Sequence, residues 1–385
     1  MQQNTPGLSD EMRNGRFVPK IKVIGLGGAG SNAVDRMITV GISGVEFIAA
    51  NTDRQALLQS EANVQVQLGP RSTRGLGAGG KANVGREAAE ESVATLRNAL
   101  AGANMVFIAA GMGGGTGTGG APVAARIARE LGALTVAIVT CPFTFEGAHR
   151  SRTAQAGLQA LSQHVHTLIQ VDNDKLLEIA PRNLQLEVAF RVADDVLRQG
   201  IQGVAELVTQ TGLINLDFAS VEAIIRQGGR ALMAIGQGDS LQQAADAALH
   251  HPLLQHDTID RASAVLVHVT GGLNLGLLEI HQAMSHIVQA ANPAADVLFG
   301  ANEDPDMEGR AQVILIATGI QELNREPIQV HSLFGVPVPA PDAQTPKPTP
   351  SPAAAMDALD LPAFMRRRTL FASGAVERTP AWATS

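Results

Sequence analysis

The sequence predicts an α/β fold in two parts, followed by an extended C-terminal region. Three observations lead to this prediction. Short β-like runs alternate with longer helical ones from Lys20 to Gly319, glycine-rich segments follow several of the β-like runs, and a proline-rich stretch stands near the C-terminus. Alternating strands and helices form a parallel sheet covered on both faces, and such a sheet places ligands at the carboxyl ends of its strands.

The first part is expected to be a Rossmann-like parallel-sheet domain over residues 19–184, after a flexible N-terminal segment of residues 1–18. Its β-like runs are Lys20–Gly25, Val45–Ala50, Val64–Leu68, Met105–Ala110 and Ala133–Thr140. Helical spacing lies between them at Asn32–Val40, Glu87–Leu100 and Ala121–Leu131.

A long central helix is expected next, over residues 185–209. Its apolar residues recur at steps of three and four: Leu186, Phe190, Ala193, Leu197, Ile201, Val204 and Leu207. At 1.5 Å per residue such a helix would span roughly 30 Å or more, which is the width of a small domain. We expect it to join the two parts.

A second, smaller α/β domain is predicted over residues 210–320, with strands at Ala264–Thr270 and Ala311–Thr318 and a turn-rich segment at Gly236–Ser240. Residues 321–356 are predicted to be a disordered linker, because residues 335–355 alone contain seven prolines among alanine, threonine and serine. Residues 357–370 return to apolar and basic side chains, which is typical of a docking peptide. The tail of residues 371–385 has no assignment.

Composition limits the function classes. The chain has 385 residues, of which 45% are hydrophobic and 17% charged, which is typical of a soluble globular protein of about two domains. A net charge of −7 argues against nucleic-acid binding. The single Cys141 and an N-terminus without an apolar stretch predict the cytoplasm. Because no apolar run reaches ~20 residues, any membrane contact is expected to be indirect.

Three glycine-rich loops stand at predicted strand ends. Gly25–Gly30 is a GxGxxG motif with Asp53 beyond the second strand, so a nicotinamide-dependent oxidoreductase is one interpretation. That interpretation leaves Gly75–Gly80 and Gly111–Gly120 unexplained. Glycines that only permit tight turns would account for one loop more easily than for three. Backbone N–H groups and helix N-termini bind polyphosphates without a lysine, so the loops predict a cage around several phosphates.

Ordered motifs along the chain resemble those of the tubulin/FtsZ family, whose bacterial members are cell-division GTPases. They are GLGGAGSNAV (Gly25–Val34), FIAANTD (Phe47–Asp53), RGLGAGG (Arg74–Gly80), GGGTGTG (Gly113–Gly119), PFTFEG (Pro142–Gly147) and GLINLDFA (Gly212–Ala219). The resemblance covers about Lys20 to Gly319 and resumes at Leu359–Phe364. It implies a GTP-dependent protein that polymerises head to tail, forms the cell-division ring and hydrolyses GTP between subunits.

The resemblance also implies which residues contact GTP. The first phosphate loop would be Gly28, Ala29, Gly30, Ser31 and Asn32, and the second Gly114, Gly115, Thr116 and Gly117. The γ-phosphate side would be lined by Asn51, Asp53, Ala78, Gly79 and Gly80. Glu146 would contact the ribose and Arg150 a phosphate. Ordinary turn chemistry for Asp53, and an exposed helix pair for Glu146 and Arg150, are the alternatives.

Base recognition is expected at the central helix. Phe190 and Asp194 lie four residues apart and so on one face, where the ring would stack on a purine. The carboxylate would accept from N1–H and the exocyclic amine, which guanine offers and adenine does not. Asn173 matches another guanine contact of the family. The alternatives are a core Phe190, a solvated Asp194–Asp195 pair and a helix cap at Asn173.

No carboxylate in the nucleotide loops is evident as a base for hydrolysis. By resemblance it comes from the next subunit, where Asp217 would position water or a cation and Asn215 would support it. Such a heterologous contact generates an open filament. The family usually has a second aspartate where this chain has Ser220. We therefore hypothesise slow GTP turnover, with a slow or non-hydrolysing filament scaffold as the alternative function.

Partners and cofactors follow from the same resemblance. Mg²⁺ would travel with GTP and keep most of its waters, without a site made by protein side chains alone. The peptide residues Asp360, Leu361, Pro362, Phe364 and Arg366 would bind a membrane-tethering adaptor of the FtsA or ZipA kind. The main partner would be the chain itself, in a homopolymer at the mid-cell division site.

Overall fold

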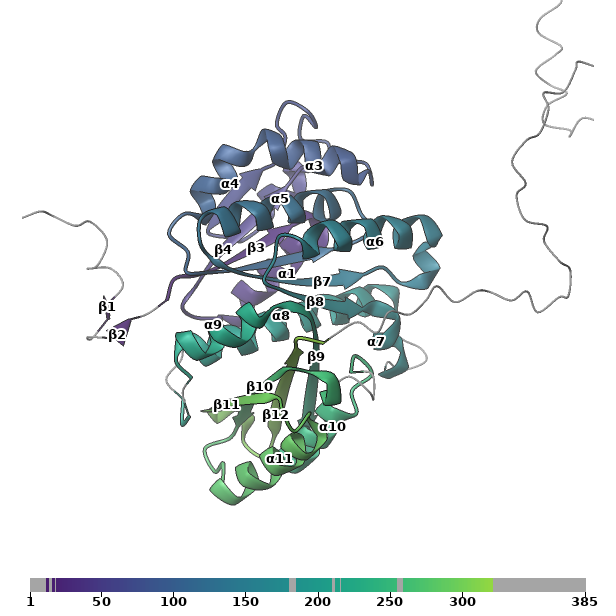
Figure 1. Cartoon of the computed structure of the whole chain (residues 1–385). Helices are drawn as coiled ribbons and strands as arrows, with labels where there is room; N and C mark the ends of the chain where they lie inside the picture. Colours follow the sequence, from purple (N-terminus) through teal and green to yellow (C-terminus); the bar gives the residue numbers. More distant parts are fainter. Residues whose placement is uncertain are drawn as a thin grey trace, which may run out of the picture. The chain divides into compact units, whose positions relative to one another are not determined.

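The computed structural model describes residues 12–13, 16–17, 19–179, 185–209, 212–214, 216–254 and 259–320 (Figure 1). The predicted linker, the adaptor-binding peptide and Asn215 lie outside these residues. Near the N-terminus, β1 (Met12–Arg13) and β2 (Arg16–Phe17) pair in an antiparallel ladder. No helix in the described ranges is long and apolar enough to cross a membrane.

One ten-stranded sheet runs through the fold, in the order β11-β10-β12-β9-β8-β7-β6-β3-β4-β5. Its strands are β3 (Ile21–Leu26), β4 (Val45–Asn51), β5 (Val64–Gln67), β6 (Met105–Gly111), β7 (Leu134–Cys141), β8 (Thr167–Asp172), β9 (Gly229–Gly238), β10 (Ala264–Gly271), β11 (Asp296–Glu303) and β12 (Ala311–Thr318). Strands β3 to β8 are all parallel. Because β3 is flanked by β4 on one side and β6 on the other, the order reverses there, and the crevice at such a reversal is where open parallel sheets bind ligands.

Helices cover both faces of the parallel part. They are α1 (Gly27–Val40), α2 (Arg54–Leu58), α3 (Ala82–Glu91), α4 (Val93–Leu100), α5 (Thr116–Glu130), α6 (Ala148–Ser162), α7 (Asn173–Ile179) and α8 (Leu186–Thr209). Alternate residues of β3 enter different cores, because side chains of a strand point to opposite faces in turn. Val23 packs with α1 and α8, whereas Ile24 packs with α3, α4, α5 and α6.

The central helix α8 also packs on the second part of the sheet (Figure 1). Gly203 allows this close approach, since a Cβ there would lie 2.6 Å from Ile314 Cδ1 of β12. The remaining helices are α9 (Phe218–Gln227), α10 (Leu241–Leu249) and α11 (Leu277–Ala290). The buried residues of α10 and α11 form a separate core on the other face of β9, β10 and β12. The 24-residue α8, roughly 36 Å long, thus connects both parts.

The structure corrects several predicted elements. Helix α1 begins at Gly27, directly after β3, rather than at Asn32. The predicted helix over Glu87–Leu100 is two helices that break at Ser92. Most of the turn predicted at Gly236–Ser240 is strand, because β9 continues to Gly238. Glycine at position 236 allows α10 to pack closely on β9, because a Cβ there would overlap backbone atoms of α10.

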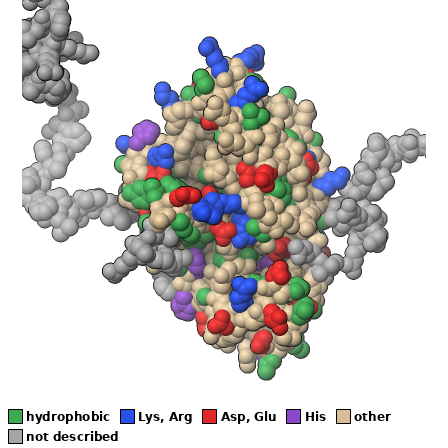
Figure 2. All heavy atoms as spheres, turned by 180° about the vertical axis from the view of Figure 1, so that it is seen from behind, with side chains coloured by type: hydrophobic (Ala, Val, Ile, Leu, Met, Phe, Trp, Pro, Cys, Tyr) green, Lys and Arg blue, Asp and Glu red, His purple; other side chains and the backbone are tan. Residues whose placement is uncertain are grey.

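Charge is mixed on the face drawn in Figure 2. Among the described residues visible there, lysine and arginine side chains are scattered between acidic and uncharged surface and do not merge into one broad basic patch. A nucleic-acid-binding face typically concentrates its basic groups on one surface. This face therefore has no such electrostatic footprint.

Candidate functional site

Two helix N-termini meet where the strand order reverses. Helix α1 follows β3 without an intervening loop, and Gly27 turns the chain with a φ of 70°. Helix α5 begins at Thr116, after β6, and a Cβ on Gly27 would lie 3.0 Å from Gly117 N. Only glycine combines this φ with so close an approach. The positive ends of two helix dipoles therefore converge, which favours an anion.

A cavity of about 250 Å³ opens at this point and brings together many of the predicted nucleotide residues. Its wall contains residues from α1, the β6–α5 loop, the segment after β7, α7 and α8. The predicted residues in the wall are Gly28, Ala29, Gly114, Gly115, Thr116, Gly117, Glu146, Arg150, Asn173, Phe190 and Asp194.

The other predicted residues lie behind or beside the wall, in three groups: Gly30, Ser31 and Asn32; Asn51 and Asp53; and Ala78, Gly79 and Gly80. Gly30 packs against β6, where a Cβ would overlap the Ala109 carbonyl oxygen. Ser31 is buried with an unpaired Oγ, and Asn32 is exposed. Helix geometry explains this, because successive residues of α1 point in different directions.

The predicted γ-phosphate side contacts the second phosphate loop. Thr52 Oγ1 and Thr116 Oγ1 lie 2.6 Å apart in a hydrogen bond, and a Cβ on Gly115 would lie 2.7 Å from Ala78 Cβ. The Asp53 carboxylate accepts from Gln55 N at 2.9 Å and caps α2. Asp53 therefore has the ordinary turn role that was its alternative. These residues support the loop from outside the cavity.

The end of the cavity formed by α7 and α8 contains an exposed ring and buried polar groups. Phe190 is 39% exposed and meets Phe143 edge to face at 5.5 Å, so it is not a core residue. Asn173 is only 4% exposed, and its Oδ1 makes no hydrogen bond. Asp194 is buried beside Arg36, with 3.4 Å between Oδ2 and the guanidinium, and is not a solvated pair with Asp195. Burial raises the pKa of Asp194 to about 6, although Arg36 acts to lower it.

Glu146 and Arg150 form the ion pair that the alternative predicted, but not as an exposed pair on one helix: Glu146 ends a short 3-10 turn before α6 and is nearly buried, and both residues line the cavity. Glu146 Oε1 also accepts from Phe143 N at 2.8 Å, which fixes the carboxylate. Arg150 is 56% exposed along its side chain, so its guanidinium is accessible to an anion in the cavity. The pair therefore joins the turn before α6 to the first turn of α6 and forms part of the cavity wall.

Several residues in or behind the cavity wall were not predicted from the sequence. Thr140, Cys141 and Pro142 line the cavity at the carboxyl end of β7. The predicted strand could have indicated them, because parallel strands place ligands at their carboxyl ends. Arg36, which lies behind Asp194 and does not line the cavity, was not predicted because its contact with Asp194 joins helices far apart in the chain. Burial raises the pKa of the Cys141 thiol to about 11, so it is a poor nucleophile at neutral pH.

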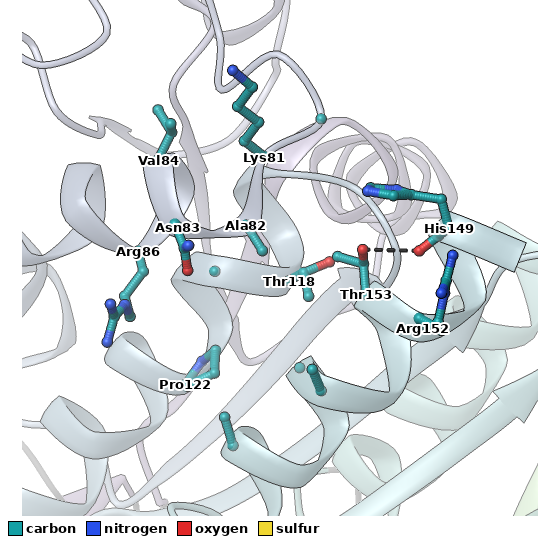
Figure 3. A pocket seen from close by; sticks show the side chains of 15 residues that line it. Lys81, Ala82, Asn83, Val84, Arg86, Thr118, Pro122, His149, Arg152 and Thr153 are labelled. Carbon is teal, nitrogen blue, oxygen red and sulfur yellow. Dashed lines mark hydrogen bonds between the residues drawn. The ribbon is translucent and has the colours of Figure 1, made fainter. Parts of the chain in front are cut away.

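A second, larger cavity of about 770 Å³ lies between α3, α5 and α6. Figure 3 shows Lys81 and Arg86 on one side, His149 and Arg152 on the other, and Thr118 between them. Of the predicted site residues only Gly80 lines it. It was not predicted from the sequence, because three separate helices form it.

Asp217 follows the end of α8 that is remote from the cavity. It caps α9, and its carboxylate accepts from Ser220 N at 3.1 Å. Hydrogen bonds from the Ser220 hydroxyl and amide lower the pKa of Asp217. Along α8, Asp194 and Thr209 are separated by roughly 22 Å, and Asp217 comes after that end. Asp217 is accordingly not among the residues that line the cavity of its own chain.

Comparisons with known proteins agree with this arrangement. Residues 20–181 match the model of the GTPase domain of the tubulin/FtsZ family, and residues 229–321 match that of the FtsZ C-terminal domain. An FtsZ dimer from M. jannaschii is 45% identical, with a TM-score of 0.76 over 79% of this chain and 89% of that one. A tryptophan-to-tyrosine mutant of M. jannaschii FtsZ matches with the same identity and TM-score, over 79% and 92%.

CetZ2 from Haloferax volcanii, solved as a GTPγS-bound protofilament, has 21% identity and a TM-score of 0.68, over 80% of this chain and 95% of that one. That likeness concerns the fold alone. The family assignment rests on the M. jannaschii relative. It excludes the interpretation of Gly25–Gly30 as the motif of an oxidoreductase. On this identity and coverage, with two converging helix N-termini at the predicted phosphate loops, the chain belongs to the FtsZ family and is a GTPase.

Proposed function

We propose that this chain assembles head to tail into protofilaments and hydrolyses GTP at each junction between subunits. The observation that carries the proposal is the position of Asp217, beyond the opposite end of α8 from the nucleotide cavity. A carboxylate there reaches a GTP only in another copy. Contacts between unlike faces leave both ends of the assembly open, so they produce a filament.

Phosphate binding is assigned to the two helix N-termini. Gly28 and Ala29 of α1 and Gly114–Gly117 before and within α5 would present backbone N–H groups to the phosphates. Gly114 has open space where a Cβ would stand, so a ligand can approach its backbone closely. Gly30, Ser31, Asn32, Asn51, Asp53, Ala78, Gly79 and Gly80 would support this site from outside the cavity wall.

Mg²⁺ would enter the site together with the nucleotide. The described residues contain no group of three histidine, cysteine or acidic side chains that could hold a metal ion. The cation would be bound by phosphate oxygens and waters, as Mg²⁺ prefers. It would neutralise negative charge on the phosphates, while Arg150 supplies the protein's own positive charge at the cavity.

Guanine recognition is assigned to α7 and α8. The exposed ring of Phe190 would stack on the base, and ionised Asp194 would accept from N1–H and the exocyclic amine. The unpaired Oδ1 of Asn173 is a further acceptor aimed at the same cavity. An unpaired buried acceptor is costly, so a ligand that donates to it gains affinity. Glu146 would accept from a ribose hydroxyl.

Exposed apolar side chains at both ends fit contacts between subunits. Leu76 is 84% exposed and Phe145 59% exposed, both at the sheet edge that holds the cavity, and Leu213 is 52% exposed near Asp217. Large exposed apolar residues of this kind are typical of interaction surfaces when they cluster. The M. jannaschii FtsZ dimer supports self-association.

The cellular role follows the family. The filament would form the cell-division ring in the cytoplasm at mid-cell, and an adaptor of the FtsA or ZipA kind would tether it to the membrane through the peptide at Asp360–Arg366. We retain the domain limits of the sequence analysis for these assignments: 19–184 for GTP binding, 185–209 for the central helix and 210–320 for the domain that activates hydrolysis. With Ser220 in place of an acid, slow turnover is part of the proposal.

One experiment tests the core of this function. Pelleting and light scattering are measured with GTP, GDP or NAD, and phosphate release is followed in the same samples. We expect assembly with GTP only, and phosphate release that depends on assembly. An Asp217→Ala variant should bind GTP and release much less phosphate. Failure of the wild type to bind GTP or to assemble with it would refute the proposal.

A further inference from the structure

The loop that carries Asp217 is attached to strand β11. Ile214 forms an isolated antiparallel bridge with Ala301, in which each backbone N–H donates to the other carbonyl at 3.1 Å. Gly300 has no room for a side chain, since a Cβ there would overlap Leu207 Cδ2 and lie 3.2 Å from Ile214 O. Leu207 near the end of α8 and Ile214 after it therefore both rest on one short stretch of β11.

Asn302 is the polar side chain at this contact. It is 7% exposed, and its Oδ1 packs so closely on Gly212 that a Cβ on this glycine would overlap it. The same Cβ would lie 2.5 Å from the Ala301 carbonyl oxygen. Asn302 Nδ2 is buried and makes no hydrogen bond. An unpaired buried donor costs about 1–3 kcal/mol, so its presence calls for a physical explanation.

We propose that Asn302 is a positioning residue for GTP hydrolysis. Packed on Gly212, beside the bridge of Ile214 to Ala301, it fixes the position of Gly212 and so holds Asp217 where the GTP of the adjacent subunit meets it. Asn302 acts through Gly212 and touches neither substrate nor reacting atoms. The inference rests on the proposed function, because it requires Asp217 to act across the junction.

The contact also predicts which kinetic quantity responds. Asn302 lies in the second part of the sheet, and the cavity of the same chain lies at the opposite end of α8. Its removal should leave the GTP affinity of its own chain unchanged. A small misplacement of a catalytic group, on the order of 1 Å, can cost up to about a hundredfold in rate. The expected effect is therefore on kcat and not on GTP binding.

The first test compares Asn302→Ala with Thr270→Ala. Thr270 of β10 stands opposite Asn302 in the strand register, so its truncation is a matched change at the same level of the sheet that does not remove the side chain packed on Gly212. We expect Asn302→Ala to bind GTP normally and to lose at least tenfold in phosphate release per pelleted subunit. Gly212→Ala, which disturbs the same contact from the loop, should do the same, so a poorly folding Asn302 variant does not remove the test.

The second test mixes subunits. An Asp194→Ala variant has a damaged nucleotide site and an intact loop, so it should supply the missing loop to GTP held by Asn302→Ala. We expect the mixture to release more phosphate than the sum of the two variants alone. A mixture of Asp217→Ala with Asp194→Ala is the reference for action across the junction.

The outcomes separate the two proposals. Equal loss in Asn302→Ala and Thr270→Ala, or a parallel loss of GTP affinity in Asn302→Ala, would mean a structural role and overturn the inference. Recovery in the Asp217 mixture without recovery in the Asn302 mixture would overturn it as well, with the junction mechanism intact. Absence of recovery in the Asp217 mixture would overturn the junction mechanism itself.

Discussion

The Arg36 guanidinium lies 3.4 Å from the Asp194 carboxylate, at the base end of the nucleotide cavity. Arg36 also donates to the Arg191 carbonyl oxygen at 3.1 Å, so this side chain of α1 braces α8 in two places. Burial raises the pKa of Asp194 to about 6, against the lowering effect of Arg36. The group proposed to read guanine is therefore close to half protonated at mildly acidic pH.

GTP binding should weaken as the pH falls through 6. Only the ionised form of Asp194 accepts from both guanine donors, and protonation below its pKa of about 6 removes that form. Below this pKa each pH unit costs up to about tenfold in affinity. Titration calorimetry between pH 7.5 and 5 measures the effect. Asp194→Asn, which does not titrate, corrects for protonation of the nucleotide, and identical pH profiles for the two proteins would contradict the prediction.

The same carboxylate should cost stability in the nucleotide-free protein. Its pKa rises from 3.8 to about 6 on folding, so the folded state binds the proton more readily than the unfolded state. Ionised Asp194 therefore destabilises the fold at pH 7, and the penalty disappears as the pH falls from 6 towards 3.8. Asp194→Asn should be more stable at pH 7 by up to about 3 kcal/mol. Urea unfolding without nucleotide measures this, and a less stable Asp194→Asn at pH 7 would contradict it.

Arg36 should set the position of this acid limb. Arg36→Ala removes the positive charge that favours ionised Asp194, so the pKa should rise further and GTP binding should begin to fail at a higher pH. Arg191→Ala is the matched control, because only the backbone carbonyl of Arg191 takes part in the contact. The two pH profiles of GTP affinity give the answer. A shift of equal size in both variants would argue for a general loosening of α8.

Local features of the sequence predicted part of this cavity. Glycine-rich loops were expected after β3 and β6, and the four-residue spacing of Phe190 and Asp194 places both in the cavity wall. The starts of α1 at Gly27 and of α5 at Thr116 were not predicted, because helical spacing was expected only from Asn32 and Ala121. Contacts between distant segments were not predictable in this way. Arg36 and Asp194 meet only because α1 packs on α8, and Asn302 meets Gly212 only because the loop rests on β11.

The motifs assign whole loops to the nucleotide, and only part of each loop lines the cavity. Gly30 and its neighbours belong to the first phosphate motif, yet Gly30 faces β6 and lies behind the cavity wall. A linear motif does not distinguish residues that face the ligand from residues that let the loop pack. That distinction depends on the direction of each residue around α1, which appears only once the helix is known to begin at Gly27.

Gly85 should be necessary for the second phosphate loop although it does not line the nucleotide cavity. A Cβ at this position of α3 would overlap the Gly115 carbonyl oxygen and lie 3.0 Å from Thr116 Cα. Gly85→Ala should therefore displace α3 or the loop, at a cost of about 1–3 kcal/mol in unfolding free energy. GTP affinity should fall as well. Asn83→Ala, on the exposed side of the same helix, is the control, and unchanged GTP affinity in Gly85→Ala would refute the prediction.

Ser220 should limit the rate of hydrolysis. Its backbone N–H donates to Asp217, and Glu222 is no substitute for the missing acid because its carboxylate pairs with Arg226 at 2.7 Å. Ser220→Asp adds a carboxylate in the first turn of α9, where the helix dipole favours it, so the fold should accept the change. We expect turnover per pelleted subunit to rise on the order of tenfold, within the range that single electrostatic groups contribute to catalysis.

The matched control is Ser220→Ala, which removes the hydroxyl without adding charge and should leave turnover below that of Ser220→Asp. The added carboxylate lies beside Asp217 and replaces a hydroxyl that lowers the pKa of that group, so the pKa of Asp217 should rise. The acid limb of the turnover profile should then move to higher pH in Ser220→Asp. Rapid phosphate release by the wild type, with no increase in Ser220→Asp, would show that the second acid is dispensable in this chain.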